Sequence, residues 1–148
     1  MNTMAENTIT RNLVLKASLD KVWNAIATPE GFAGWFLARV EGDWAAGNDV
    51  ALVWPSGNSN QIRLKTIDKP NTFAYQWHPG GYGDLDAFPE SELTTVTMSL
   101  REVSGGTELR LVESGFEAIP DDRRLKVLGL NTEGWDEETE NIRKYVEA

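Results

Sequence analysis

Hydrophobic and polar residues alternate near the start of the chain, and one face of the pattern carries Ile9, Arg11, Leu13 and Leu15. Alternation with period two predicts a β-strand. The strand leads directly into residues 17–35, where the apolar positions change to the spacing of two short helices. A strand followed at once by two helices is an unusual opening, and it indicates a scaffold built around an internal pocket.

Each of the two predicted helices has its own start signal. Ser18 suits the N-cap of the first helix, and Thr28 with Pro29 supplies the N-cap and the first residue of the second. Trp23 and Trp35 lie on these helices, and we expect their large rings to pack the helices against a sheet.

From residue 36 to residue 116 the pattern is that of β-structure. Six further strands are predicted, over residues 36–41, 49–54, 61–67, 72–77, 93–102 and 107–114. Short turns rich in Gly, Pro and Asn separate most of these strands, as in an antiparallel meander. Residues 78–91 differ, because a connection of that length is often a binding lid or a mobile segment.

Helical spacing returns after Pro120 and continues almost to the end of the chain. Positions spaced three and four residues apart form one face of this helix. They are Leu125, Leu128, Thr132, Trp135, Thr139, Ile142 and Val146. Gly129 and Gly134 each weaken a helix by about 1 kcal/mol relative to Ala, so the helix can bend near them. The element order is therefore β-α-α-β6-α, with a long last helix.

Composition narrows the functional classes. The chain of 148 residues has the length of one domain, which we expect to span residues 1–148 with a core of about 8–146. Its formal net charge of −9 argues against nucleic acid and against an anionic membrane surface as partners. Without Cys, and with a single His, the chain lacks the ligands of a zinc site, and we expect no metal or other cofactor. No apolar run has the length of an export signal or a membrane span, so a cytoplasmic location is expected.

Four motifs along the chain can be compared with those of known families. They are residues 21–30 with Trp35, residues 40–44 with Gly47, residues 105–111 followed by Gly115 and Phe116, and the pair Gly134 and Trp135. In this order they resemble the SRPBCC (START-like) superfamily, and most closely the homologues of the 90-kDa heat-shock-protein ATPase activator, over about Thr8 to Val146. The resemblance implies an α+β helix-grip fold, in which a curved seven-stranded antiparallel sheet wraps a long C-terminal helix.

The resemblance leaves the activity open, because the superfamily includes lipid carriers, polyketide cyclases, hydroxylase domains and cochaperones. Two departures concern the pocket. Family members commonly carry Leu at helical spacing after the Gly-Trp pair, where this chain has Thr139 and Ile142. The 78–91 loop is also longer than usual, so the resemblance does not determine the shape or the opening of the pocket.

Side chains on a strand alternate between two faces, so each predicted strand turns one row toward the last helix. We expect these rows to line a cavity, and the candidate ligand-binding residues are Trp54, Phe73, Tyr75, Trp77, Met98, Leu111, Glu113, Trp135 and Thr139. The aromatic rings of these rows either line that space or fill it. No residue is assigned a catalytic or metal-binding role.

Glu113 is the unusual member of this set, because it continues the apolar row of Leu109 and Leu111. One interpretation makes its carboxylate a polar anchor for a ligand in a mainly aromatic cavity. The other places it where the strand ends, in contact with water or paired with an Arg, since an unpaired buried charge is costly. Arg63 is not this partner, because it alternates with apolar neighbours and is expected to face solvent.

His78 is the only histidine, and it stands before Pro79 at the start of the long loop, so we expect it to be solvated. No nucleophile motif accompanies it. Four acidic residues of the same loop lack the spacing of a calcium-binding loop and are also expected to be solvated: Asp84, Asp86, Glu90 and Glu92.

Three functions follow from these patterns. The first, which the apolar rows favour, is the binding of a small hydrophobic or aromatic molecule such as a lipid, a polyketide or a flavonoid-like compound. The second is cochaperone-like activation of a heat-shock-protein ATPase, which the resemblance implies and which would use the acidic outer surface on a chaperone partner. The third is a polyketide cyclase-type enzyme with Glu113 or Tyr75 as acid or base. It is the least supported, because acid–base catalysis generally needs two groups and one candidate carboxylate is found.

Overall fold

Seven strands form one antiparallel sheet in the computed structural model, which describes residues 7–80 and 84–148. The strands are β1 (Thr8–Leu15), β2 (Arg39–Glu41), β3 (Asp49–Val53), β4 (Ser59–Asp68), β5 (Thr72–Trp77), β6 (Thr94–Val103) and β7 (Gly106–Ser114). Their order across the sheet is β1-β7-β6-β5-β4-β3-β2, so the meander from β2 to β7 is closed on one side by the first strand. Residues 1–6 and 81–83, the latter in the predicted 78–91 loop, lie outside the described residues.

Three α-helices accompany the sheet: α2 (Leu19–Ala27), α3 (Pro29–Phe36) and α4 (Asp121–Glu147). Short 3-10 turns occupy Leu85–Ala87, Glu90–Glu92 and Phe116–Ala118. Both predicted N-caps are present. Ser18 Oγ accepts the backbone N–H of Lys21 at 3.2 Å, and Thr28 Oγ1 accepts that of Gly31 at 3.1 Å.

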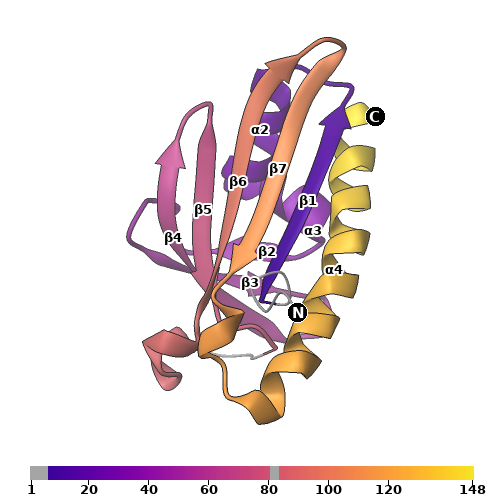
Figure 1. Ribbon diagram of the computed structural model, residues 1–148. Coiled ribbons are helices and arrows are strands. Elements are labelled where there is room, and N and C mark those ends of the chain that lie inside the picture. Colours follow the sequence, from indigo (N-terminus) through magenta and orange to yellow (C-terminus); the bar gives the residue numbers. More distant parts are fainter. Residues whose placement is uncertain (1–6, 81–83) are drawn as a thin grey trace, which may run out of the picture.

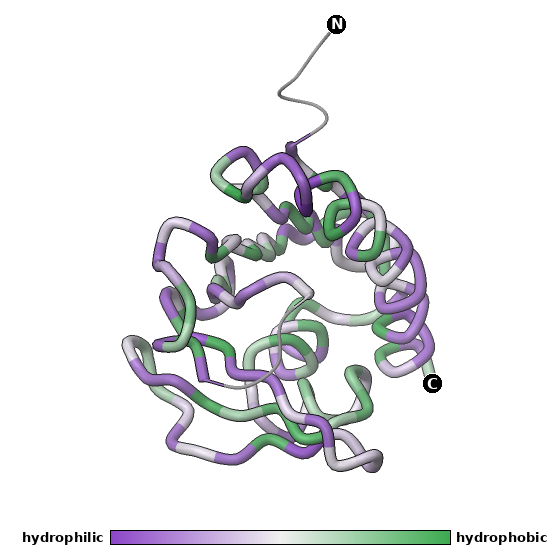
Figure 2. Tube along the Cα trace, turned by 90° about the horizontal axis from the view of Figure 1, so that it is seen from below, coloured by the Kyte–Doolittle hydropathy of each residue, from purple (hydrophilic) through white to green (hydrophobic). Residues whose placement is uncertain are grey.

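The helix α4 lies alongside β1 and also contacts α2 and α3 (Figure 1). Seen from below, the strands form a curved wall with α4 to one side, and hydrophobic and hydrophilic residues alternate along them (Figure 2). The register between β4 and β5 shifts between Leu64 and Thr66, an irregularity of the kind that bends a sheet. The arrangement is the helix-grip fold that the family resemblance implies.

The core lies where the inward rows of the sheet meet the helices. Val96 of β6 stands opposite Tyr75 of β5 and Glu113 of β7, and all three side chains are completely buried. Trp23 and Trp35 are 3% and 1% exposed, which confirms that they pack α2 and α3 into the core.

The strand predicted over residues 36–41 is shorter than expected. The helix α3 continues through Phe36, and Leu37 closes it in the left-handed conformation with φ 61°. The strand then begins only at Arg39, and Phe36 is buried as the last residue of a helix.

The apolar face of α4 begins later than its spacing predicts. Leu125 is 69% exposed, whereas Trp135, Ile142 and Val146 are buried as expected. The first turns of α4 lie below the N-terminal end of β1 in Figure 1, so that strand gives them no surface to pack against. The helix continues unbroken through Gly129 and Gly134.

Candidate functional site

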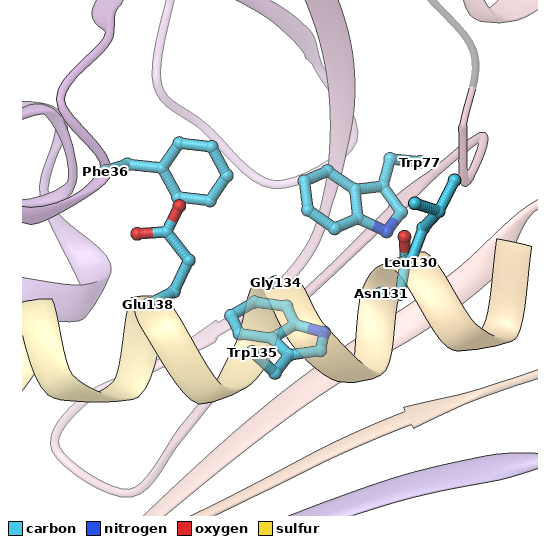
Figure 3. Close-up of a pocket in the computed structure, with 7 residues that line it drawn as sticks. All are labelled: Phe36, Trp77, Leu130, Asn131, Gly134, Trp135 and Glu138. Atoms are coloured by element: carbon cyan, nitrogen blue, oxygen red, sulfur yellow. The ribbon is translucent and has the colours of Figure 1, made fainter.

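A cavity of about 100 Å³ lies between α4, the end of α3 and the end of β5. Figure 3 shows the residues that line it: Phe36, Trp77, Leu130, Asn131, Gly134, Trp135 and Glu138. A wider cleft of about 460 Å³ shares all of these except Trp135 and extends to Trp54, Asn60, His78, Pro79 and Gly80. The volume of the cleft falls within the range of roughly 300–1,000 Å³ that is usual for small-molecule sites, whereas the volume of the inner cavity lies below that range.

The α4 side of the cavity is built by residues three or four positions apart, which share one face of a helix. They are Asn131, Gly134, Trp135 and Glu138. Gly134 leaves this surface open, because a Cβ atom at its position would meet nothing within 4 Å. Across the cavity stand Phe36 and Trp77, whose ring centroids are 6.0 Å apart.

Behind the two indole rings, Glu113 is 0% exposed. Its Oε1 accepts a hydrogen bond from Trp135 Nε1 at 2.8 Å, and its Oε2 accepts one from Trp77 Nε1 at 2.9 Å. Thr94 Oγ1 donates to Oε2 at 2.6 Å, and Asn131 Nδ2 donates to both oxygens at 3.1 and 3.0 Å. All four donors are neutral side chains, so hydrogen bonds to the charged acceptor offset the cost of its burial.

These contacts correct the interpretation that placed Glu113 at the rim of the sheet with water or an Arg. Arg63 pairs instead with Asp49 on the other face, with Nε and Oδ1 2.8 Å apart. Glu113 is also not a lining residue of the cavity. It connects α4 with β5, β6 and β7 and fixes the orientation of two walls.

Glu138 is a second carboxylate, on the cavity side of α4. Asn141 Nδ2 donates to its Oε1 at 3.1 Å, and Figure 3 shows the carboxylate directed toward Phe36. Burial raises the pKa of Glu138 to about 7; the hydrogen bond from Asn141 opposes this rise, and the charge of Glu137 adds to it.

The raised pKa predicts how stability depends on pH. Because the folded-state pKa of Glu138 lies above the ordinary value of 4.5, the fold disfavours the ionised carboxylate. The free energy of unfolding should therefore fall as the pH rises from the ordinary pKa toward 7, by about 1–2 kcal/mol after screening of this half-buried group. Glu138→Gln removes that loss, so urea unfolding should show it more stable than the unaltered protein by this amount above about pH 8.

The control for this experiment is Glu137→Gln, which removes the same charge from an exposed position on the same helix. It should change the free energy of unfolding by about 0.5 kcal/mol or less at every pH. Parallel pH profiles for Glu138→Gln and the unaltered protein would show that burial of Glu138 has no energetic consequence.

Tyr75 is completely buried, and its hydroxyl has no hydrogen-bond partner among the described residues. Burial raises the pKa of Tyr75, and the charges of Glu113 and Glu138 raise it further. Its ring packs edge-on against Phe32 and Trp77, with centroids 5.8 and 5.3 Å apart. Tyr75 therefore belongs to the core behind the wall and lines neither the cavity nor the cleft.

The structure separates the predicted ligand-binding residues into groups. Trp77 and Trp135 line the cavity, and Trp54 lines the outer cleft. Four others have completely buried side chains that fill the core: Phe73, Tyr75, Met98 and Leu111. Glu113 contacts the walls from behind, and Thr139 donates its hydroxyl to the backbone oxygen of Trp135 at 2.7 Å.

The prediction of a solvated His78 is wrong, since this residue is 7% exposed. Its ring stacks on Phe88 with centroids 3.8 Å apart, and its Nε2 lies 3.3 Å from Glu92 Oε1. The same oxygen accepts a hydrogen bond from Arg123 at 3.0 Å. Residues after 84 thus fold back over the start of the loop, a tertiary contact that a local Gly and Pro pattern does not reveal.

The acidic residues of this loop behave differently from one another. Asp84, Asp86 and Glu90 are exposed as predicted. Glu92 is half-buried, and its carboxylate contacts His78 and Arg123. The hydrogen bond with His78 lowers the pKa of Glu92, and Arg123 lowers it further. No group of metal-ligating side chains forms within residues 7–80 and 84–148. In those same ranges, no helix has the length and apolarity needed to cross a membrane.

The lining residues missed by the sequence analysis are Phe36, Leu130, Asn131, Gly134 and Glu138. Phe36 was expected in a strand. The four α4 residues were missed because the helical face predicted over residues 125–146 does not include them, although Leu130 is itself apolar. Asn131 lies four positions before Trp135 and Glu138 three positions after it, which places them on the same side of the helix. Polar residues at this spacing were the available signal.

Comparison with known proteins relates the whole architecture to one family. The family model "Activator of Hsp90 ATPase homolog 1-like protein" matches residues 16–147. No curated protein sequence matches the chain.

Several solved structures share the fold at low sequence identity. Protein BH1534 from Bacillus halodurans has a TM-score of 0.71 at 24% identity, over 95% of this chain and 96% of its own. The Aha1 dimer structure from Colwellia psychrerythraea has a TM-score of 0.74 at 18% identity, over 95% and 96%. DynU16, a protein in the dynemicin biosynthetic locus, has a TM-score of 0.75 at 18% identity, over 96% of this chain and 48% of its own. Since the family model covers nearly all of the sequence, the chain belongs to the family of activator of Hsp90 ATPase homolog 1-like proteins.

Proposed function

We propose that this protein binds a small hydrophobic or aromatic molecule between α4 and the sheet. The observation that carries the proposal is the cavity of about 100 Å³ with its adjoining cleft of about 460 Å³. Phe36, Trp77 and Trp135 supply aromatic walls, and Asn131 and Glu138 supply a few polar atoms. Apolar walls with few polar groups are the usual composition of a small-ligand site.

Two features indicate that the cavity is a binding site and not a defect in the packing of the core. Gly134 leaves room for a side chain on its own helix, although Gly weakens a helix by about 1 kcal/mol relative to Ala. Glu113 holds the indole rings of Trp77 and Trp135 in place from behind. The walls are therefore set before a ligand arrives, which lowers the cost of binding.

Gly134→Leu tests the proposal by filling the cavity from its own wall. A panel of lipids, polyketides and flavonoids, with naphthol as a small neutral probe, should raise the melting temperature of the unaltered protein and quench its Trp fluorescence. Gly134→Leu should fold at least as well, because the helix loses a Gly, but bind the same compounds about tenfold more weakly or worse.

Gly129→Leu is the matched control, since Gly129 lies on the exposed side of α4 and its Cβ would also meet nothing within 4 Å. It should gain the same helical stability and keep full binding. Equal binding by the two variants would contradict the proposal. So would an inert panel together with no co-purified small molecule in native mass spectrometry.

Activation of a chaperone ATPase is a second candidate, which the family membership and the name of the Colwellia psychrerythraea structure favour. Such activation would use the outer surface, where a net charge of −9 suits a basic partner. The two candidates separate because Gly134→Leu changes the cavity and leaves that surface intact.

A further inference from the structure

The inner cavity presents acceptors for hydrogen bonds, while the side-chain donors that line it are already engaged. Among the described lining residues, the donors are Trp77 Nε1, Trp135 Nε1 and Asn131 Nδ2, and each of them donates to Glu113. With its nitrogen directed at Glu113, the Asn131 amide turns its Oδ1 the other way. This oxygen and the Glu138 carboxylate are the side-chain acceptors left on the wall.

Above its raised pKa of about 7, Glu138 carries a negative charge that no cation among the described residues pairs with. The described residues give it one hydrogen bond, from Asn141 Nδ2 at 3.1 Å, and no ion pair. Neither the cavity nor the cleft is lined by a described Lys or Arg. Glu137 on α4 carries a charge of the same sign and raises the pKa of Glu138.

Aromatic rings, together with Leu130 and Gly134, form the remaining walls. The centroid of Trp77 lies 6.0 Å from those of both Phe36 and Trp135. Aromatic faces attract cations through the ring quadrupole, and a carboxylate beside them supplies the countercharge. A neutral apolar ligand would leave the Glu138 carboxylate buried further without a partner, which is costly.

We propose that the cavity selects molecules that carry a protonated amine, with the ammonium group against Glu138 and Asn131 Oδ1 and an apolar or aromatic remainder in the outer cleft. This inference rests on the proposed function and names its ligand class. The inner space of about 100 Å³ suits a head group, and the cleft of about 460 Å³, with Trp54 and Pro79 on its walls, suits the larger remainder. The net charge of −9 favours the approach of a cation over that of an anion.

Three probes of one shape and different charge test the selection: phenylpropylamine, phenylpropanol and phenylpropanoate. Isothermal titration at low salt and about pH 8, where the pKa values leave Glu138 ionised and the amine protonated, should give the amine about tenfold higher affinity than the alcohol. Phenylpropanoate should bind more weakly than either the amine or the alcohol. Glu138→Gln should lower the affinity for the amine to about that for the alcohol, and change the affinity for the alcohol by about twofold or less.

Glu137→Gln is the matched control, because it removes the same charge one position away, on the exposed side of α4. It should leave the affinity for the amine within about twofold of the original value. An equal loss in both variants would overturn the inference, since it would assign the preference to overall charge. Equal affinities for the amine and the alcohol would overturn it as well.

The outcomes distinguish this inference from the function on which it rests. If the alcohol binds, and Gly134→Leu abolishes that binding, the cavity is a ligand site even when the amine gains nothing. If none of the three probes binds at any attainable concentration and the wider panel is inert, the proposed function fails, and the choice of ligand class fails with it.

Discussion

Glu113→Ala should lower the free energy of unfolding by about 4 kcal/mol, because it leaves four donors inside the protein without their acceptor. Trp77, Thr94 and Trp135 are at most 9% exposed, so bulk water has little access to their donor groups. Glu113→Gln should cost less, about 2 kcal/mol, since the amide oxygen still accepts on one side while its NH₂ group faces an indole N–H on the other. Urea unfolding monitored by Trp fluorescence measures both changes.

The control lies on the same strand. Glu108 of β7 pairs with Arg101 across the sheet at 2.9 Å, and the Arg101 side chain is 70% exposed. Glu108→Gln should therefore change the free energy of unfolding by about 0.5 kcal/mol or less. Full stability of Glu113→Gln would show that the buried cluster does not depend on a charged acceptor.

The same variants connect the cluster to binding. Trp77 and Trp135 form opposite parts of the cavity wall, and their indole nitrogens are tied to the two oxygens of one carboxylate. A Glu113→Gln protein that is still folded should bind naphthol less well, because one wall loses its anchor. The carboxylate thus acts on a ligand through the rings that it positions.

The sequence predicts the fold well because alternation and helical spacing are local. Alternation places Glu113 in the row of Leu109 and Leu111 and so singles it out, but it leaves open whether the carboxylate faces the interior or the rim of the sheet; in the structure Glu113 is buried. Its partners were out of reach, since Asn131 and Trp135 meet it only when α4 closes on the sheet. Alternation gives the face of a residue but not its neighbours.

The wrong predictions also arise because tertiary contacts cannot be derived from a local pattern. Leu125 satisfies the helical pattern, yet it is exposed because the first turns of α4 extend past the N-terminal end of β1. His78 sits in a loop that reads as solvated, yet Phe88 covers its ring from ten positions along the chain. Glu138 was passed over because a polar residue beside an apolar face is usually solvated, and a cavity is not a local property.

Gly31→Ala should destabilise the protein by about 3 kcal/mol, because two helices approach too closely there for a side chain. A Cβ atom at this position would lie 2.1 Å from the backbone oxygen of Asn24 and 2.7 Å from that of Ala25. These carbonyls cannot swing aside: Asn24 O accepts from Thr28 Oγ1 at 2.6 Å, and Ala25 O accepts from Trp35 Nε1 at 2.9 Å. The helix α3 would have to move away from α2.

Gly34→Ala separates this contact from a general effect of replacing Gly in α3. Its Cβ would lie 2.3 Å from Cε1 of Tyr145, but that ring is 43% exposed and can turn toward solvent. The change in unfolding free energy should be about 1 kcal/mol or less, since the helix also gains from losing a Gly. Phe36 ends α3 and lines the cavity, so Gly31→Ala should weaken naphthol binding as well, whereas Gly34→Ala should not. Stability of Gly31→Ala equal to that of Gly34→Ala would show that the α2–α3 contact does not set the position of this wall.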